Sequence, residues 1–591
     1  MEIHYTVRVG DPSQHRGKFS IDLDRVSAPS VDLVVPSWVP GSYLIRNYSR
    51  GFRDFSAHRV PEGTSLPVEP VDKARWRVHT GGAERLRVDY TVYGHELLTE
   101  GFDLTPDHLF LNAALCLPYV DGHVTEPATV SLEVPPDWKA VTELEEVGTS
   151  PPRFRARHYD ELVDSPIDVG RPVVLTVRPA GVPHRICLCG EGGNYEATTL
   201  ERDVTKIVEA AVALLGDSPL TGYTFFYHLT DRRDGGLEHE TSTSCVVERT
   251  CFRPAESYRR FLSLTAHEYL HLYNVKRIRP RALQPFDYTR ENYTRLLWWM
   301  EGTTDYFTYL LLRRAGLLTP TQYLEQRAGL VRDYLGTPGR DRISLEESSL
   351  IAWVDHYLPY EETPNQSVSY YLKGDLVSMC LDLEIRHQSD ARASLEDVLR
   401  LLWKEHGRTG AGVEEDGILP AANRATGLDL AKFFDRFIRG TDEVDLPAFA
   451  RYAGLVLAPK KKRPDEREKA EPGDLGVAVE EEGGFARVRH AFAGRPGHAA
   501  GLTPGDEIIA LNGVKVTFAG LEKALERYPA GTPADLTVFR RGYLRQVALI
   551  TGVRPPTAYE FTPMDSAPES ARKVYESWIG EKWAPEAPGS D

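Results

Sequence analysis

Two histidines and a glutamate in the segment HEYLH, residues 267–271, have the types and spacing of a catalytic metal site. The segment lies in a long apolar run without glycine or proline, which predicts a buried helix. Because residues four apart share one face of a helix, His267 and His271 can bind one ion. Zinc accepts neutral imidazole nitrogens and keeps one position open for water in catalytic sites. Glu268 lies one residue further round, where its carboxylate can take a proton from that water.

Glu301 is the predicted third protein ligand of such a site. This residue is an isolated carboxylate in the apolar stretch LLWWMEGTTDYFTYL, and burying an unpaired carboxylate is costly. One Zn²⁺ ion held by His267, His271 and Glu301 would neutralise its charge. Asp305, one helical turn further on, is placed to accept a hydrogen bond from the second ring nitrogen of His267 and so to orient that ligand.

Each of these residues also has a purely structural interpretation. The two histidines could be core side chains hydrogen-bonded to the backbone, with Glu268 paired with a neighbouring cation such as Arg277. Asp305 could be an ordinary aspartate on a helix surface. The HEYLH pattern alone does not decide, because two histidines at this spacing arise by chance on any long helix.

The pattern of the whole chain predicts a multidomain α+β protein. Its 591 residues are too many for one domain with a single hydrophobic core, since a domain typically holds about 150 residues. Short alternating runs predict antiparallel β-structure at the N-terminus. Helical periodicity, for example from Leu200 to Leu215, predicts a mainly helical catalytic domain. The expected parts are an N-terminal β-domain (1–180), the catalytic domain (181–458), a charged linker (459–472), a second β-patterned domain (473–555) and a tail with one short helix (556–591).

Charge and composition exclude several classes of partner. The formal net charge of -16 at pH 7 disfavours binding to nucleic acid or to anionic membranes. No stretch of 18 apolar residues could span a membrane, and the first residues alternate like a strand rather than a secretory signal. We therefore expect a cytoplasmic protein with neither nucleic acid nor a membrane as partner.

The cysteines do not indicate a site of their own. Six in the whole chain are too few for a disulfide scaffold and suit a reducing compartment. Cys187 and Cys189 are separated by a single residue, which is wrong for a zinc knuckle or a thioredoxin motif. We interpret both as ordinary strand residues.

Longer motifs around the histidines resemble the glycyl aminopeptidase family of thermolysin-like zinc peptidases, in which a glutamate is the third ligand. The resemblance spans most of residues 1–550. It rests on HEYLHLYNVKRIRP (267–280), WWMEGTTDY (298–306) and VPSWVPGSYLIR (35–46). It implies a thermolysin-like catalytic domain, peptide substrates with a free N-terminus and a preference for N-terminal Gly or Ala.

A second motif, GGLEH at residues 235–239, is similar to the Gly-x-Met-Glu-Asn element that binds the substrate N-terminus in related zinc aminopeptidases. The resemblance assigns the substrate ammonium group to Glu238 and main-chain hydrogen bonds to Gly235 and Gly236. Leu replaces Met and His replaces Asn here, which leaves the side-chain preference open. The alternative is a solvated loop in which Glu238 and Glu240 merely face water.

A third motif, SYYLKGD at residues 369–375, resembles the Tyr-x-Lys-Gly element of the same enzymes. There a tyrosine hydroxyl stabilises the developing oxyanion, an effect worth about 3 to 4 kcal/mol for each donor removed. By position this tyrosine is Tyr371. Tyr370 is the competing choice, and the two rings could also be core packing.

The run AAGLTPGDEIIALNG at residues 499–513 resembles a PDZ domain of the bacterial-protease type. Such a domain accepts an extended peptide as an added strand, and residues 475–477 are the candidate carboxylate-binding loop. A domain packed against its own chain would look the same. Two other functions therefore stay open: an endopeptidase whose PDZ domain recruits substrates, and a non-catalytic peptide-binding scaffold with a vestigial metal site.

Overall fold

The computed structural model describes residues 1–461 and 471–583. Most of the predicted linker, residues 462–470, lies outside the described residues. The chain divides into two compact units. One comprises Met1–Thr294, Phe307–Leu317 and Leu399–Glu415, and the other comprises Arg295–Tyr306, Leu318–Val398 and Asp416–Asp591. Of the described helices, none has both the length and the apolar character needed to cross a membrane.

An eight-stranded sheet begins the first unit, in the order β14-β15-β12-β1-β2-β8-β4-β5. The bounds of its strands not given below are Glu145–Thr149 (β14), Pro152–Ala156 (β15), Arg16–Asp24 (β2), Phe52–Arg59 (β4) and Ser65–Leu66 (β5). In β8 (Arg85–Tyr93) every second residue is buried, the alternation of a strand with one face on a core. The predicted β-rich N-terminal region is thus confirmed. The prediction of antiparallel pairing is wrong for one pair of strands in this sheet, because β1 (Glu2–Asp11) and β12 (Ala128–Glu133) run parallel. Parallel neighbours need a long crossover, and here most of the sheet's other strands lie between the two in sequence.

Two four-stranded sheets complete the N-terminal β-structure. One has the order β11-β3-β7-β6, with bounds Tyr119–Val120, Ser30–Val34, Arg75–His79 and Val68–Pro70. The other has the order β13-β16-β10-β9, with bounds Lys139–Val141, Ile167–Gly170, Leu109–Leu111 and Phe102–Leu104. Strands β9, β10 and β16 are buried along their whole length, so this sheet is covered on both faces.

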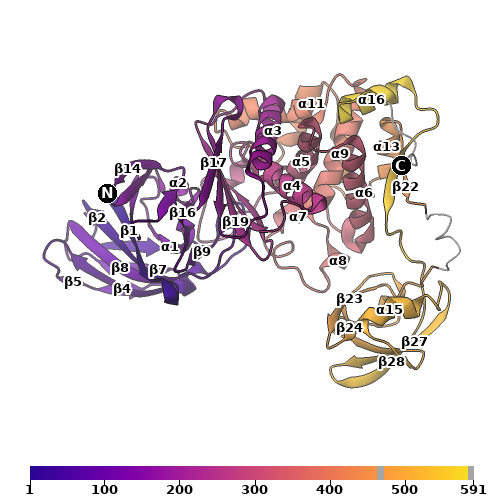
Figure 1. Cartoon of the computed structure of the whole chain (residues 1–591), viewed down its shortest axis with the longest axis horizontal. Helices are drawn as coiled ribbons and strands as arrows, with labels where there is room; N and C mark the ends of the chain where they lie inside the picture. The colour runs from indigo at the N-terminus through magenta and orange to yellow at the C-terminus, as the bar shows by residue number, and fades with distance from the viewer. Residues whose placement is uncertain (462–470, 584–591) are drawn as a thin grey trace. The chain divides into compact units, whose positions relative to one another are not determined.

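A five-stranded sheet with the order β17-β18-β19-β21-β20 follows in the same unit. Helices α3 and α4 pack on it (Figure 1). The predicted helix from Leu200 is confirmed as α3 (Ala197–Leu215), and the HEYLH segment ends α4 (Ala255–His271). The short edge strand β20 runs antiparallel to β21. The bounds of the strands are Val173–Val177 (β17), His184–Cys189 (β18), Tyr223–Thr230 (β19), Gly235–Glu238 (β20) and Ser242–Glu248 (β21).

The second unit is mainly helical, as predicted for this part of the chain. A π-helical turn, Trp298–Thr303, packs against α9 (Tyr370–Gln388). Gly302 and Gly374 make this approach possible, because a Cβ on Gly302 would lie 2.6 Å from the Cα of Gly374. A larger residue at either position would force the two helices apart.

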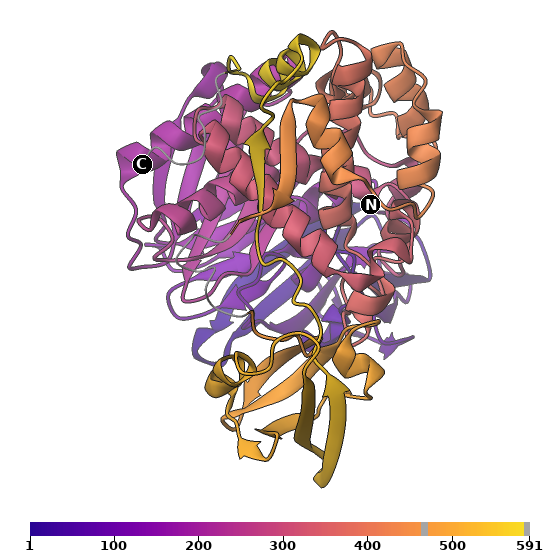
Figure 2. The same cartoon turned by 90° about the vertical axis from the view of Figure 1, so that its right-hand side faces the viewer.

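Residues after the small β-domain return to the helical part of the second unit. Strand β29 (Tyr559–Pro563) pairs with β22 (Leu455–Pro459), as Figure 2 shows. The short helix predicted near the C-terminus is confirmed as α16 (Glu569–Ile579), and its Trp578 is fully buried. Strand β29 was not predicted, because its five residues carry little periodicity and its partner β22 lies about a hundred residues earlier in the sequence.

The predicted small β-domain (473–555) contains a six-stranded sheet with its own hydrophobic core. The strands follow the order β23-β24-β25-β27-β28, and β26 pairs with β25. Gly476, just before β23, has φ +69°, and a Cβ there would lie 2.3 Å from the Cβ of Arg495. The bounds are Val477–Glu482 (β23), Phe485–Ala491 (β24), Glu507–Leu511 (β25), Val514–Lys515 (β26), Phe518–Leu525 (helix α15), Pro533–Arg540 (β27) and Tyr543–Ile550 (β28).

Candidate active site

His267 and His271 lie on one face of the last turns of α4. Their Nε2 atoms are 2.8 Å apart, and their rings are perpendicular. The Nδ1 of His271 is 2.8 Å from the main-chain oxygen of Asn274. A carbonyl oxygen can only accept, so Nδ1 carries the proton and Nε2 of neutral His271 offers a lone pair. This is the tautomer that a metal ligand needs, and the backbone fixes it.

Glu268 is buried beneath the edge strand β20. A Cβ on Gly236 would lie 2.2 Å from Oε1 of Glu268, so only glycine lets the strand pass this close. The hydroxyl of Thr243 lies 3.4 Å from Oε2 of Glu268 and 3.0 Å from the main-chain oxygen of Leu237. The carboxylate of the HEYLH motif is therefore held directly against the backbone of the GGLEH segment.

Glu238 ends β20 and is only 4% exposed. The alternative considered above was that Glu238 and Glu240 both face water. Glu240 is exposed, but Glu238 is buried. Gly41 of the N-terminal VPSWVPGSYLIR motif packs on this carboxylate. A Cβ on Gly41 would lie 2.7 and 2.9 Å from the two oxygens, and Gly41 has φ +98°. The N-terminal domain therefore supplies one wall around Glu238.

Asp164 anchors the end of β20 to the segment after α4. It accepts hydrogen bonds from the main-chain nitrogen of Glu240 at 2.7 Å and from Nζ of Lys276 at 2.5 Å, and His239 Nδ1 lies 3.3 Å away. Burial would raise the pKa of Asp164, but the charges of Lys276 and His239 outweigh it and hold that pKa well below its usual range. The aspartate is therefore ionised at neutral pH. The sequence also suggested Arg277 as a partner for Glu268. In the structure Nη2 of Arg277 lies 3.4 Å from Oε1 of Glu240.

Glu301 lies in the π-helical turn of the second unit and is 1% exposed. Its charge acts on His356, whose ring lies 5.0 Å from that of Tyr370 and 5.1 Å from that of Tyr371. Burial lowers the pKa of His356 below its usual value, although Glu301 opposes the shift. Asp305 is half-buried one turn beyond Glu301. A neutral imidazole thus lies among the residues predicted to act on the substrate.

The two candidate tyrosines differ in burial. Tyr370 is fully buried, whereas Tyr371 is half-buried. Lys373 of the same motif is also buried, and its Nζ donates to the main-chain oxygen of Arg340 at 2.9 Å. Burial lowers the pKa of Lys373 to about 8. The lysine therefore holds a neighbouring loop, and Tyr371 is the tyrosine with access to solvent.

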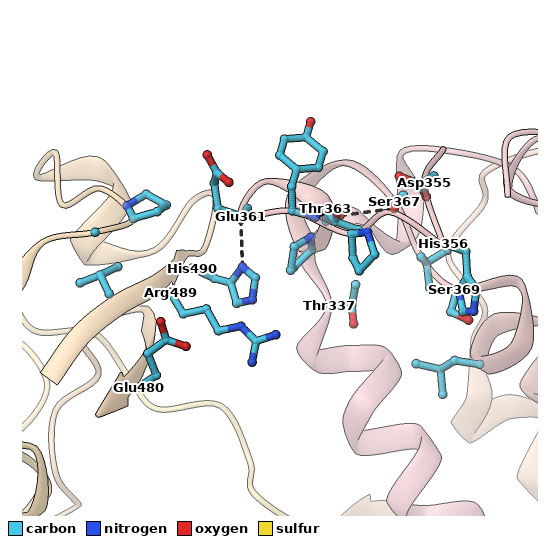
Figure 3. A pocket seen from close by; sticks show the side chains of 18 of the residues that line it. Thr337, Asp355, His356, Glu361, Thr363, Ser367, Ser369, Glu480, Arg489 and His490 are labelled. Carbon is cyan, nitrogen blue, oxygen red and sulfur yellow. Dashed lines mark hydrogen bonds between the residues drawn. The ribbon is translucent and has the colours of Figure 1, made fainter. Parts of the chain in front are cut away.

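Figure 3 shows a pocket of the second unit near this motif. Asp355, His356 and Ser369 line one side, and Glu480 and Arg489 of the six-stranded domain line the other. The pocket carries both acidic and basic side chains.

His267, His271 and Glu301 form one of two groups, among the residues that the structure describes, whose ligand atoms lie within 4.8 Å of one another. Two imidazoles and one carboxylate are a donor set that suits catalytic zinc, because three protein ligands leave a position open. The fixed tautomer of His271 fits this use.

Two models of one peptidase family match the sequence. Residues 260–377 match M61 glycyl aminopeptidase, and residues 4–171 match the peptidase M61 N-terminal domain. The chain is similar to M61 peptidases. These matches support a peptidase, and the first of them includes every predicted metal ligand. The GGLEH segment lies outside both matched ranges.

Solved structures add to the M61 similarity. An aminopeptidase N family protein from Idiomarina loihiensis is 28% identical, covers 98% of this chain and 100% of its own, and has a TM-score of 0.91. An M1 zinc metallopeptidase from Deinococcus radiodurans is 15% identical over 76% of this chain and 94% of its own, with a TM-score of 0.48, too low to support a conclusion. No curated protein matches the sequence.

Three residues of this M61-like site were missed by reasoning from sequence. Gly41, Asp164 and His356 lie far from HEYLH in the chain. Gly41 belongs to the VPSWVPGSYLIR motif, which indicated the family resemblance but not the contact of Gly41 with Glu238. Nothing in the local sequence marks Asp164 or His356, because their importance comes only from long-range contacts.

Proposed function

We propose that this chain is a zinc aminopeptidase that removes N-terminal residues from peptides. The observation that carries the proposal is the His267–His271 pair, whose Nε2 atoms converge while the backbone fixes the tautomer of His271. Glu301 belongs to the same group of possible ligands. We assign these three side chains to one Zn²⁺ ion.

Glu268 is the proposed general base and acid. When bound, zinc lowers the pKa of a water molecule and polarises the scissile carbonyl. Glu268 takes a proton from that water and later delivers it to the leaving amine. Its position against Gly236 supports this role, because a peptide lying along β20 would bring its main chain close to the carboxylate.

Tyr371 is the proposed donor to the oxyanion that forms at the carbonyl oxygen. Its partial exposure favours it over the buried Tyr370. Asp305 is the proposed partner of the second ring nitrogen of His267, as a carboxylate that orients a metal ligand.

Glu238 is the proposed recognition group for the free N-terminus. The Glu238 carboxylate is buried at the end of β20, and a buried carboxylate can form an ion pair with the ammonium group of a substrate. The edge strand β20 can hydrogen-bond an extended peptide through Gly235 and Gly236. Because Glu238 ends that strand, it would fix the peptide so that cleavage follows the first residue. A preference for Gly or Ala, implied by the family, and a cytoplasmic location stay predictions.

The small β-domain, residues 473–555, is proposed to be a PDZ domain. Its edge strand β23 follows the glycine loop at 475–477, the position where a peptide would add. Contacts with its own chain support the packed alternative: Asn365 donates to the main-chain oxygen of Ala491 at 2.9 Å, and His490 Nδ1 lies 2.9 Å from the main-chain oxygen of Glu361. We therefore propose that the domain shapes the pocket of Figure 3, with capture of peptide C-termini as the second candidate.

The decisive test compares matched peptides with free and acetylated N-termini, with and without a chelator. An aminopeptidase releases single amino acids only from the free-amine series, and chelation stops it. Equal cleavage of both series would favour the endopeptidase. A Glu268→Gln variant that retains its metal but loses activity would exclude the scaffold, whereas a wild-type chain inactive on every peptide would support it.

A further inference from the structure

Four side chains of the first unit converge on a second buried point, outside the HEYLH motif. They come from separate segments: His108 precedes β10, Asp168 lies in β16, Cys189 ends β18 and His228 lies in β19. Each offers one ligand atom, and these atoms all lie within 4.8 Å of one another. The group combines two imidazoles, a carboxylate and a thiol.

One oxygen lies at the centre of this arrangement. Oδ2 of Asp168 is 2.7 Å from Nε2 of His108 and 3.0 Å from Nε2 of His228. Cys189 is the direct neighbour of His228 on the parallel strands β18 and β19. Asp168 and His228 have no exposed side-chain surface, Cys189 is 4% exposed and the His108 side chain is 20% exposed.

A hydrogen-bonded ion pair explains this geometry poorly. An ionised carboxylate has about four acceptor sites, shared between its two oxygens. Here both imidazoles meet Oδ2, while the buried Oδ1 of Asp168 has no hydrogen-bond partner among the residues that the structure describes. Leaving such atoms unsatisfied costs free energy. A bound cation, in contrast, requires several ligand atoms that converge on one point, as they do here.

The surroundings of His108 also suit a metal ligand. Oδ2 of Asp103 lies 3.9 Å from Nδ1 of His108, on the side of the ring away from Asp168. Carboxylates in this position orient ligating histidines. Gly170 packs beside this histidine, since a Cβ there would lie 3.2 Å from the main-chain oxygen of Asp107 and 3.4 Å from Cδ2 of His108.

We propose that His108, Asp168, Cys189 and His228 hold a second zinc ion that does not take part in catalysis. Four protein ligands of the N, N, O and S types complete a tetrahedron and leave no position for substrate water, as in structural sites. Two neutral imidazoles with one carboxylate and one thiolate balance the charge of Zn²⁺. The Cys189 thiol loses its proton to solvent as the sulfur–metal bond forms.

The position of this site indicates its role. Asp168 belongs to the sheet β13-β16-β10-β9, and His108 directly precedes its strand β10, whereas Cys189 and His228 belong to the sheet that ends in β20. An ion bound by all four joins the N-terminal β-structure to the sheet that carries Glu238. The second zinc would therefore stabilise the walls of the substrate site without touching the substrate.

Metal analysis of the full-length chain tests the proposal. We expect two equivalents of zinc in the wild type, one in His267→Ala and one in His228→Ala, with both variants folded by circular dichroism. Replacement of zinc by Co²⁺ gives a second readout, because a cobalt–thiolate bond absorbs in the near ultraviolet and the His267, His271 and Glu301 group contains no thiolate. Cys189→Ser should abolish this band, and Cys251→Ser, a cysteine outside the group, should keep it.

The cobalt spectrum of the wild type decides the matter even if a core variant fails to fold. Absence of a thiolate band from cobalt-loaded wild-type protein, or a band unchanged in Cys189→Ser, would overturn the proposal. So would a single equivalent of zinc that disappears in His267→Ala. These outcomes leave the proposed catalytic centre intact, so the two proposals can fail separately.

Discussion

Gly236 lies so close to Glu268 that any side chain at position 236 would collide with the carboxylate. A Cβ there would meet Oε1 at 2.2 Å and Cδ at 2.3 Å. The two residues come from different motifs, one on an edge strand and one on α4. Their contact sets the distance between a peptide lying along β20 and the group that is proposed to move protons, so this distance can be changed by a single methyl group.

Gly236→Ala should therefore lower kcat/KM strongly. The added methyl group must displace either the strand or Glu268, and misplacement of about 1 Å can cost about 100-fold in rate. Steady-state kinetics on a short peptide would measure the loss, and metal content should stay unchanged. Gly329→Ala is the control, because Gly329 lies in α6 (Pro320–Gly336) and, within the described part of the chain, no atom lies within 4 Å of its added Cβ. Full activity of Gly236→Ala would contradict the proposed substrate path.

Glu238→Gln should weaken recognition of the free N-terminus. Loss of one partner from a buried, hydrogen-bonded charge pair costs about 2 to 5 kcal/mol in binding. We expect a higher KM for free-amine peptides and a smaller difference between free and acetylated substrates. Glu240→Gln removes an equal charge two residues away, where the side chain is exposed, and should leave both values near those of the wild type. Similar effects of the two substitutions would argue against the assignment of Glu238.

Local pattern was enough to predict the elements that repeat regularly. The alternation in β8 and the apolar run of α4 indicate a strand and a helix without further information, because each buries one face on a core. The HEYLH spacing likewise predicts that two imidazoles meet on one helix face. The isolated carboxylate of an apolar stretch indicated Glu301 in the same way, whereas Glu238 was assigned only by motif resemblance.

The remaining contacts depend on the three-dimensional arrangement of distant segments. Gly41 packs on Glu238, although nearly two hundred residues separate them. Cys189 read alone suggests an ordinary strand residue, since its close neighbour Cys187 has the wrong spacing for a known motif. Its grouping with His108 and Asp168 follows from the pairing of strands across two sheets, which sequence spacing does not encode.

Tyr371→Phe should lower kcat with little change in KM. A donor that acts on the oxyanion contributes only in the transition state, and removal of one such donor costs about 100- to 1,000-fold in kcat. Tyr370→Phe is the matched comparison, since Tyr370 is its buried neighbour. Rapid-quench or continuous assays on one peptide would measure both. A larger loss of kcat in Tyr370→Phe would move the role to that residue.

Asp164→Asn should destabilise the protein most at neutral pH. The variant leaves the buried ammonium group of Lys276 without its partner, and breaking a buried pair from one side costs about 3 to 5 kcal/mol. Burial alone would raise the pKa of Asp164, but Lys276 and His239 lower it in the folded state. The ionised carboxylate therefore stabilises the fold above about pH 4, the usual aspartate pKa, and this contribution is lost as the pH falls below that value.

Urea unfolding of the wild type and of Asp164→Asn at about pH 7 and about pH 3 would test this prediction. The difference in unfolding free energy between the two proteins should be smaller at the lower pH. Asp137→Asn is the control, because Asp137 pairs with Arg171 on the surface and its loss should change stability little at either pH. A gap that widens in acid would mean that folding raises the pKa of Asp164. The anchor at the end of β20 would then not depend on its charge.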